Sequence, residues 1–236
     1  MKNITLVVPT FNSPEVVLNM LSSLRTNTDW EGRIIVVNNG GELPPLGEGV
    51  EVLQPGRNTG WMGAVNLGLE ATSSELFCMA NDDLLFVPGS WEFWSTLWSG
   101  FAAAPKVAGV APTSNYVAGC QSAWWHTRGV HVEAPYLIGM LAMYDTGILK
   151  ELGGLDEALP GGDDLDLSMR VQQSGRTLVC SRHAYVHHIG SLTGRREQPS
   201  HWDSRAHQTA TQNALIQKYG LKAWHAMMTQ PARVLR

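Results

Sequence analysis

The sequence predicts an α/β fold in which a mostly parallel sheet is flanked by helices. Short apolar runs alternate with longer segments of helical periodicity, as in successive strand, helix and strand units. Polar residues also collect where several of the apolar runs end. Because ligands of open α/β sheets bind beyond the ends of the strands, we expect a binding site at one edge of this sheet.

The composition limits what the protein can do. A chain of 236 residues with 44% hydrophobic content can build a sizeable core. Charged residues make up 16% and the net charge is -4, so no global field recruits nucleic acid or an acidic membrane. No apolar run approaches the roughly 20 residues that span a bilayer. Without an interdomain linker in the sequence, we expect a single domain over residues 1–236.

The cysteines indicate the compartment. Cys78, Cys120 and Cys180 are odd in number and widely spaced, which argues against a disulfide framework and against a cysteine-based metal site. The first apolar run is too short for a secretory signal. We therefore expect a cytoplasmic protein, which a partner or an acceptor could hold at a membrane.

The first quarter of the chain predicts strand, helix, strand and strand. Residues 4–8 are an apolar run that ends in a proline, as expected of an interior parallel strand. Ser13 and Pro14 follow as the N-cap and first residue of a helix. The buried face of this helix comprises Val17, Met20, Leu21 and Leu24. Residues 34–37 and 50–53 are the next two predicted strands.

The next helix carries a seam of small residues. Gly60, Ala64 and Gly68 are spaced at i, i+4 and i+8, which leaves one face nearly bare. A glycine inside a helix costs about 1 kcal/mol, so something must approach this face closely. We expect Gly68 to pack on the sheet. Asn58 and Gly60, at the helix start, are better placed to contact a phosphate or a sugar.

An apolar run at residues 76–80 ends in one amide and two carboxylates, Asn81, Asp82 and Asp83. The run predicts a buried strand that delivers all three side chains to one edge of the sheet. The adjacent carboxylates repel each other, and residues 76–92 contain no Lys or Arg. A divalent cation would relieve the repulsion, since carboxylates bind Mg²⁺ or Mn²⁺ together with substrate phosphates. A loop whose aspartates cap the next helix is the alternative, and this stretch alone does not separate the two.

The middle of the chain is patterned less evenly. We expect a helix from Pro88, strands at residues 107–111 and 136–144, and a short helix at residues 146–152. One face of the first helix would carry Trp91, Trp94, Leu97, Trp98 and Phe101. This aromatic stripe fits a core or an interface better than a cofactor site. The weakly patterned residues 112–133 predict a functional or mobile loop.

A second acidic cluster follows a double glycine. Asp163, Asp164 and Asp166 open a predicted helix that stops at Gly175. The helix dipole favours acidic residues in the first turn by about 0.3–1 kcal/mol each. This capping effect accounts for one or two of the three aspartates, which leaves a functional role open for the rest.

The chain continues with short strands and a helix. Residues 177–180 and 185–186 are predicted strands, and His187 and His188 follow the second of them. Adjacent residues on a strand point to opposite faces, so only one of these histidines should face a site. Residues 202–219 are polar and predict a helix.

Several short motifs in this order resemble those of the family 2 glycosyltransferases, especially the small rhamnosyltransferase-like members. The motifs are Val8-Pro9-Thr10-Phe11-Asn12, Val36-Val37-Asn38-Asn39-Gly40, Asn58-Thr59-Gly60-Trp61 with Gly63 and Asn66, Asn81-Asp82-Asp83, Gly153-Gly154-Leu155-Asp156-Glu157, Asp163-Asp164-Leu165-Asp166-Leu167-Ser168-Met169-Arg170, and Asn213 with Lys218-Tyr219-Gly220. No single motif is specific, but the complete series in order is. The resemblance runs from residue 4 to about residue 220.

The resemblance implies the GT-A fold, with a Rossmann-like, mostly parallel sheet flanked by helices. It implies an inverting, metal-assisted transfer of a sugar from a nucleoside diphosphate, UDP or dTDP first, to a hydroxyl of a glycan, a lipid-linked sugar or another acceptor. Residues 1–83 would bind the nucleotide sugar and residues 84–220 the acceptor, followed by a tail at 221–236. The implied donor-binding residues are Pro9, Thr10, Asn12, Asn38, Asn58, Gly60, Asn81, Asp82 and Asp83.

The resemblance also implies the catalytic groups. Asp83 would bind Mn²⁺ or Mg²⁺, and a metal there stabilises the charge that grows on the leaving diphosphate. Asp164 matches the family position of the general base, with Asp163 second, and a carboxylate beside two others is the kind whose pKa is raised. For Asp166 and Arg170, an ion pair at i and i+4 on a helix explains the pattern better than catalysis.

Two departures from the family motifs and one choice between neighbouring histidines stay open. Asn38 replaces an aspartate that in many relatives receives the N3 proton of uracil or thymine; an amide can also donate to cytosine, so the nucleobase is less fixed than the class. Asp163 replaces the usual glutamate, which leaves open which carboxylate is the base. His188 is favoured over His187 as a further metal ligand, because its spacing to Thr193 matches the family's H-x(4)-[ST] pattern.

Three other functions compete with this one. A sugar nucleotidyltransferase usually has a basic, glycine-rich loop after its first strand, but no Lys or Arg occurs between Lys2 and Arg25. A carbohydrate-binding GT-A-like module without turnover would not need two intact acidic clusters. Nucleic-acid binding has only Arg195, Arg196 and scattered aromatic residues in support, although a modified base remains open as an acceptor.

Overall fold

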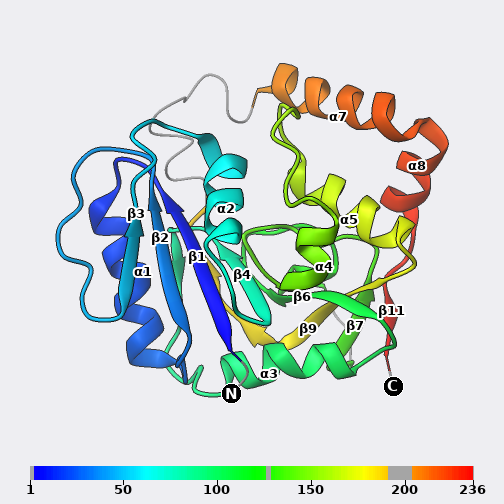
Figure 1. Ribbon diagram of the computed structural model, residues 1–236. Coiled ribbons are helices and arrows are strands. Elements are labelled where there is room, and N and C mark those ends of the chain that lie inside the picture. The colour runs from blue at the N-terminus through cyan, green and yellow to red at the C-terminus, as the bar shows by residue number, and fades with distance from the viewer. Residues whose placement is uncertain (1–2, 126–128, 191–203, 236) are drawn as a thin grey trace.

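The fold is a nine-stranded mixed sheet with helices on both faces (Figure 1). The computed structural model describes residues 3–125, 129–190 and 204–235. The strand order is β11-β7-β9-β6-β8-β4-β1-β2-β3. These strands are β1 (Ile4–Thr10), β2 (Arg33–Asn38), β3 (Val50–Leu53), β4 (Leu76–Ala80), β6 (Val107–Thr113), β7 (His131–Ala134), β8 (Leu141–Asp145), β9 (Thr177–Tyr185) and β11 (Arg233–Val234). A separate ribbon pairs β5 (Leu84–Leu85) with β10 (His187–His188).

The parallel strands all belong to two groups within this sheet. Strands β3, β2, β1 and β4 run parallel, and so do β6 and β9. Strand β8 joins the two groups by pairing antiparallel with both β4 and β6. The predicted α/β architecture is therefore confirmed, and β4 lies inside the sheet between β8 and β1.

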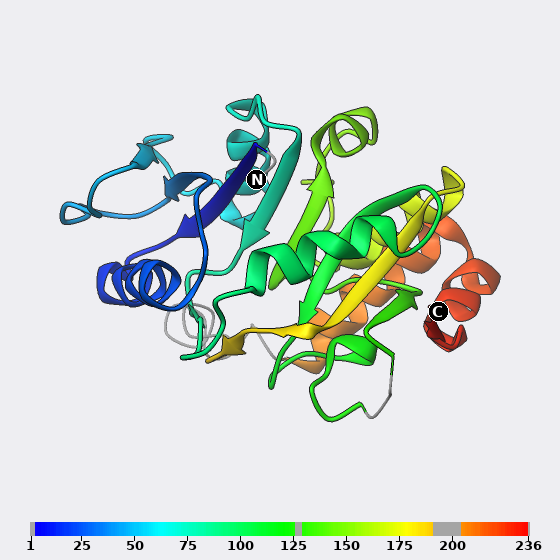
Figure 2. The ribbon, with the colours of Figure 1, turned by 90° about the horizontal axis from the view of Figure 1, so that it is seen from below.

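Helices cover both faces of the sheet, as the two views in Figures 1 and 2 show. The helices are α1 (Pro14–Asn27), α2 (Gly60–Glu70), α3 (Phe93–Ser99), α4 (Thr146–Glu151), α5 (Asp163–Gln173), α7 (Arg205–Tyr219) and α8 (Leu221–Thr229). Helices α1 and α3 pack on one face, whereas α2, α4 and α5 pack on the other. Among the described residues, no helix is long and apolar enough to cross a membrane.

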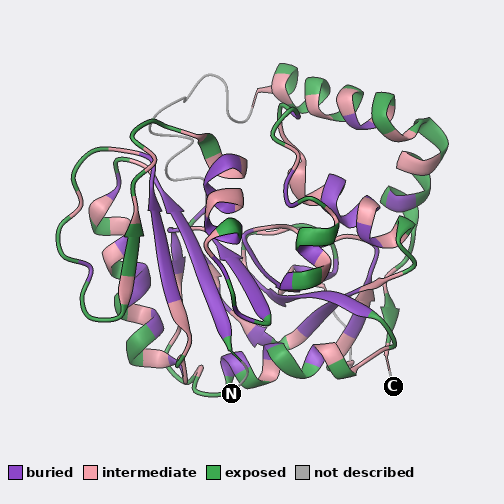
Figure 3. Ribbon diagram, in the orientation of Figure 1, coloured by how far each residue is buried: buried purple, intermediate pink, exposed green. Residues whose placement is uncertain are grey.

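The alternation of side chains along β1 divides the core into two clusters. Leu6 and Val8 pack toward α1, whereas Val7 packs toward α2. Both clusters are buried, which is why the central strands are apolar on both faces (Figure 3). At Gly68 an added Cβ would lie 2.3 Å from Val7 Cγ1, so only glycine allows α2 to lie this close to β1. The expected packing role of Gly68 is confirmed.

The prediction of the helix from Pro88 is partly wrong. Helix α3 begins at Phe93, because the chain before it turns at Gly89 with φ of +90°. Trp91 and Trp98 are 59% and 41% exposed, so they do not belong to the core. An aromatic cluster forms instead from the buried Phe86, Phe93 and Trp94 with the partly buried Trp30.

Other boundaries also differ from the prediction. Of the strand expected at residues 136–144, only the part in β8 forms. The backbone N–H groups of Leu137, Ile138 and Gly139 donate to side chains from elsewhere in the chain and not to a neighbouring strand. The two short strands expected at 177–186 are the single strand β9. The tail forms α8 and β11, and β11 pairs with β7 and becomes one edge of the sheet.

Candidate active site

The carboxyl ends of β1, β2 and β4 meet at one edge of the sheet. Thr10 ends β1 directly beside Asn38, which ends β2, and β4 runs parallel on the other side of β1. Asn81, Asp82 and Asp83 follow β4 at the same edge. The predicted gathering of polar groups at this edge is therefore present in the fold.

Two loops on the β2 side of this edge are tied together by asparagine side chains. Asn39 Oδ1 accepts hydrogen bonds from the backbone N–H and the hydroxyl of Thr59, at 3.1 and 2.8 Å, and Asn39 Nδ2 donates to Gly60 O at 3.0 Å. Asn12 Oδ1 accepts from Gly41 N at 3.0 Å. These bonds hold the loop after β1, the loop after β2 and the start of α2 in one arrangement.

Asn38 is buried, and its amide bonds within its own loop. Its Oδ1 accepts from Gly40 N at 3.1 Å and its Nδ2 donates to Gly41 O at 2.7 Å. Next to this loop, Asn58 Oδ1 accepts from Gly60 N at 2.8 Å. Gly60 itself is exposed with φ of +70°, so the start of α2 faces open space.

The two aspartates after β4 contact different partners. The hydroxyl of Thr10 donates to Asp82 Oδ2 at 2.7 Å, and burial raises the pKa of Asp82 to about 6. Asp83 Oδ1 lies 3.0 Å from His188 Nε2, and Asp83 Oδ2 accepts from Gly190 N at 3.1 Å. Asp82 thus faces β1, whereas Asp83 faces the segment that contains β10.

Both the ring and the backbone of His188 are held by polar contacts. Its Nδ1 lies 3.1 Å from the carbonyl oxygen of Tyr116, which can only accept, so Nδ1 carries a proton. Its backbone N–H donates to Asn115 Oδ1, and Asn115 Nδ2 donates back to its carbonyl. Its Nε2 also lies 3.2 Å from Asn81 Nδ2. Burial lowers the pKa of His188, but the hydrogen bond and charge of Asp83 outweigh this and raise it.

Of the two neighbouring histidines, only His188 lies against Asp83 in the described contacts. His187 Nδ1 is 3.4 Å from the hydroxyl of Tyr185. The β5 and β10 ribbon sets this orientation, because it pairs His188 with Leu84, the residue after Asp83. Thr193, whose spacing to His188 favoured that histidine, lies outside the described residues, as do Arg195 and Arg196.

The residues at this edge fit a divalent cation that arrives with a substrate. No group of three or more His, Cys, Asp or Glu side chains that could hold a metal occurs among the described residues. Asp83 and His188 are two adjacent donors, and Mg²⁺ and similar ions commonly use one or two carboxylates plus substrate phosphates. A histidine whose other ring nitrogen donates to a backbone carbonyl has the usual orientation of a metal ligand.

The second acidic cluster lies in the first turn of α5. Asp163 Oδ2 accepts a hydrogen bond from the indole of Trp61 at 3.1 Å. Removal from water raises the pKa of Asp163 to about 7, and the charge of Asp164 adds to this. Asp164 Oδ2 accepts from Gly139 N at 3.3 Å and its Oδ1 from Leu165 N at 2.8 Å; burial also raises its pKa.

Two backbone residues join the acidic clusters. Asn81 N donates to Met140 O at 2.8 Å, and the preceding residue, Gly139, donates to Asp164. An added Cβ at Gly139 would lie 3.7 Å from Asp164 Cβ and also from Met79 Sδ, on β4. The two clusters therefore contact one short segment, which connects the start of α5 with the end of β4.

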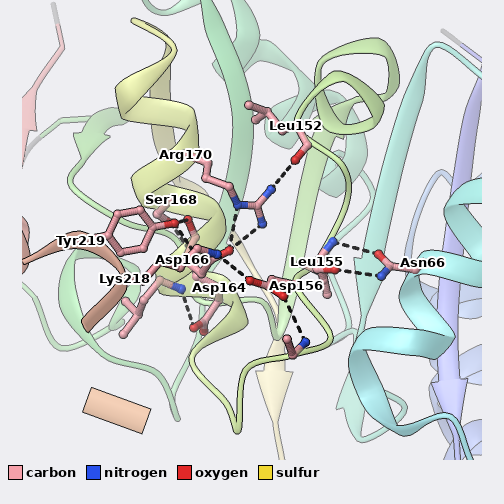
Figure 4. A network of polar contacts seen from close by, with 12 residues as sticks. Asn66, Leu152, Leu155, Asp156, Asp164, Asp166, Ser168, Arg170, Lys218 and Tyr219 are labelled. Carbon is pink, nitrogen blue, oxygen red and sulfur yellow. Dashed lines mark hydrogen bonds and ion pairs between the residues drawn. The ribbon is translucent and has the colours of Figure 1, made fainter. Parts of the chain in front are cut away.

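Asp166 has a different environment from the other two aspartates of α5. Its side chain is fully buried, and Arg170 Nε donates to Asp166 Oδ2 at 2.8 Å (Figure 4). The predicted ion pair at i and i+4 is confirmed. Lys218 and Tyr219, at the end of α7, also reach Asp166.

Sequence reasoning missed the contacts that connect the two parts of the site. Asn66 forms two hydrogen bonds with the backbone of Leu155, at 2.8 and 2.9 Å, and Trp61 reaches Asp163. Both residues lie on α2 and occur in the motif around Gly60, so the motif marked them without indicating their partners. The contacts of Asn115 and Tyr116 with His188 had no sequence signal.

Comparisons with known proteins identify similar sequences. Residues 5–116 match the family model described as glycosyl transferase family 2. An uncharacterized protein of Mycobacterium tuberculosis (strain ATCC 25618 / H37Rv) is 24% identical over 245 residues, which cover 94% of this chain and 85% of that protein. The pre-mycofactocin glycosyltransferase of the same strain is 25% identical over 209 residues, which cover 79% of this chain and 43% of that protein.

A comparison with solved structures identifies the fold. The mannosyltransferase PcManGT from Pyrobaculum calidifontis, in complex with GDP-Man and Mn²⁺, matches with a TM-score of 0.63 and 17% identity, over 97% of this chain and 70% of that chain. At this identity the likeness concerns the fold. That fold is the GT-A fold of glycosyltransferases.

Proposed function

Because this chain belongs to the family 2 glycosyltransferases and has the GT-A fold, we propose that it inverts the anomeric centre of a sugar as it transfers that sugar from a nucleoside diphosphate to an acceptor hydroxyl. The observation that carries this proposal is that both acidic clusters contact the same short segment, Gly139 and Met140. An inverting displacement needs charge stabilisation at the leaving group and a base on the opposite side of the sugar. The cluster at Asp83 supplies the first and the cluster at Asp164 the second.

Asp83 and His188 would hold a divalent cation, Mn²⁺ or Mg²⁺, together with the donor diphosphate. When bound, that cation supplies charge stabilisation for the leaving diphosphate. The carbonyl of Tyr116 keeps the proton on His188 Nδ1, which directs Nε2 toward Asp83. The Mn²⁺ in the complex of the structurally similar mannosyltransferase supports this choice.

Asp164 is the proposed general base, with Asp163 as the alternative. The backbone N–H groups of Gly139 and Leu165 orient the Asp164 carboxylate, and each of its oxygens keeps a further lone pair for an acceptor proton. Burial raises the pKa of Asp164, which favours the uptake of a proton by its carboxylate.

The donor would lie along the edge formed by β1, β2 and β4. Pro9, Thr10 and Asn12 would line it on the β1 side, with Asn81 and Asp82 on the β4 side. Asn38, Asn58 and Gly60 complete the set from the neighbouring loops. Because the amide of Asn38 is already bonded to Gly40 and Gly41, it would meet a nucleobase through the second lone pair of Oδ1. UDP- and dTDP-sugars are the first donors to test, and GDP-sugars the next.

Turnover with a panel of sugar nucleotides tests the function. Wild-type protein is incubated with UDP-, dTDP- and GDP-sugars and glycan or lipid-linked acceptors, with Mn²⁺ or with EDTA. We expect a transfer product with inverted anomeric configuration by NMR, formed only with metal. Asp83→Asn should abolish Mn²⁺-dependent binding of the nucleoside diphosphate, whereas the exposed control Glu42→Gln should bind as wild type does. Retained configuration, or unchanged turnover of Asp83→Asn, would overturn the proposal.

A further inference from the structure

The motif that ends α7 has no role in the chemistry proposed so far. Lys218 and Tyr219 are the last two residues of α7 and lie far along the chain from both acidic clusters. Both side chains nevertheless point back to α5, the helix that begins with Asp163 and Asp164 (Figure 4). A motif with this placement calls for a physical explanation.

The contacts of these two residues converge on one buried carboxylate. Lys218 Nζ lies 2.6 Å from Asp166 Oδ1, and the hydroxyl of Tyr219 donates to the same oxygen at 2.6 Å. Arg170 occupies the other oxygen, Oδ2. Asp166 is fully buried, so these three donors replace the water that its charge would otherwise bind.

Lys218 also reaches the turn that precedes α5. Its Nζ lies 2.6 Å from Asp156 Oδ2 as well as from Asp166. The neighbour of Asp156 in this turn, Leu155, is held by Asn66 of α2. One ammonium group therefore connects α7, the turn before α5 and α5 itself, and the turn is in contact with the donor side of the fold.

A second contact between α7 and α5 lies immediately before the catalytic pair. An added Cβ at Gly162 would lie 2.8 Å from Thr211 Cγ2, and one at Gly161 would lie 3.1 Å from Thr211 Oγ1. The double glycine thus lets α7 approach the start of α5. Leu215 is the buried residue of α7. The polar contacts of Lys218 and Tyr219 with α5 add to this packing.

We propose that Lys218 and Tyr219 are positioning residues for the glycosyl transfer. By holding the Asp166 carboxylate they fix the first turn of α5, and with it Asp163 and Asp164, relative to the sheet edge formed by β1, β2 and β4. The inference rests on the proposed function. Asp166 follows Asp164 by half a helical turn, so a shift of its carboxylate displaces the base. An error of about 1 Å in the position of a reacting group can lower a rate by about 10²-fold.

The contacts of Asp166 indicate that the loss of Lys218 should affect the position of α5 more than the stability of the whole protein. Without Lys218, Asp166 keeps Arg170 and Tyr219, so its buried charge does not become unpaired. Lys218 is partly exposed and Asp166 keeps two other donors, so the loss of Lys218 should cost less stability than leaving a buried charge without partners. We therefore expect Lys218→Met to fold and to be defective in the chemical step.

The test compares Lys218→Met with Lys222→Met, the same substitution at an exposed lysine on α8. We expect kcat of Lys218→Met to fall about tenfold or more, while KM for the donor stays within about twofold of wild type. Lys218→Arg should restore most of kcat, because a guanidinium can still bridge Asp156 and Asp166. Tyr219→Phe should show a smaller loss of the same kind.

Hydrogen exchange gives a readout that needs no substrate. Amides of residues 161–166 should exchange faster in Lys218→Met than in wild type or Lys222→Met, at equal melting temperature. Wild-type kcat together with unchanged exchange in Lys218→Met would overturn the inference, as would equal losses in kcat and in donor affinity. If wild type and Lys222→Met show no turnover with any donor, the proposed function fails instead, and the exchange result still decides whether Lys218 orders α5.

Discussion

Trp61 and Asp163 join the two sides of the candidate active site: the indole Nε1 on α2 lies 3.1 Å from the carboxylate Oδ2 at the start of α5. Helix α2 begins at the donor edge, and α5 carries the proposed base. The hydrogen bond stabilises the ionised form of Asp163 and opposes the effect of burial on its pKa. Trp61 is thus in a position to tune the acidic pair from the donor side.

Trp61→Phe should shift the pH profile of transfer. Phenylalanine keeps an aromatic ring but cannot donate, so the ionised form of Asp163 loses a partner and its pKa rises above the value of about 7. The acidic limb of kcat/KM should therefore move to higher pH. The pair titrates together, so the shift is expected whichever aspartate is the base.

The control for Trp61 is Trp91→Phe, at an exposed tryptophan outside the core. Its profile should coincide with that of wild type. An unchanged acidic limb in Trp61→Phe would show that the indole does not influence the catalytic pair.

The two neighbouring histidines should respond differently to alanine substitution. His188 lies against Asp83, whereas His187 contacts Tyr185, so His188→Ala removes a proposed metal ligand and His187→Ala does not. Activity measured across a Mn²⁺ titration should show a much higher metal requirement, or no turnover, for His188→Ala alone. Equal behaviour of the two variants would mean that both histidines are structural.

The elements that the sequence predicted best are those whose signals are local. Strands β1 and β4 were recognisable because they are buried on both faces and therefore apolar throughout. The tight packing of Gly68 followed from its spacing with Gly60 and Ala64. These features depend on a few neighbouring positions, so one sequence suffices to find them.

The features that escaped prediction depend on partners far along the chain. Residues 136–140 have the sequence pattern of a strand, but their N–H groups donate hydrogen bonds to the side chains of Gln121 and Asp164. No strand forms there. Asp82 and Asp83 look equivalent in the sequence, yet Asp82 accepts a hydrogen bond from Thr10 whereas Asp83 contacts His188. No periodicity encodes such pairings, which is why the roles of these site residues remain predictions for experiment.

Asp163→Asn should stabilise the protein at alkaline pH. The pKa of Asp163 is raised to about 7 in the folded protein and is near 3.9 in the unfolded chain. The folded state therefore binds the proton more tightly, and this contribution to stability is present below about pH 4 and is lost as the pH rises through about 7. Asparagine removes the charge and can still accept from Trp61 through its amide oxygen.

Thermal melts at pH 5 and pH 8 measure this effect. The gain in melting temperature of Asp163→Asn over wild type should be larger at pH 8 than at pH 5. Glu42→Gln, at an exposed acid, should show no such difference. A gain that is independent of pH would contradict a raised pKa at Asp163.

Asp164→Asn should uncouple donor binding from transfer. The hydrogen bonds described for the Asp164 side chain go to Gly139 and Leu165 and none to the loops after β1 and β2, so the nucleotide should still bind with wild-type affinity. A general base contributes roughly 10²–10⁴-fold, and kcat should fall by at least about 10². The matched variant Asp163→Asn leaves Asp164 in place and should retain more activity. If Asp163→Asn loses more than Asp164→Asn, the base is Asp163, and the bond from Trp61 then acts on the catalytic carboxylate itself.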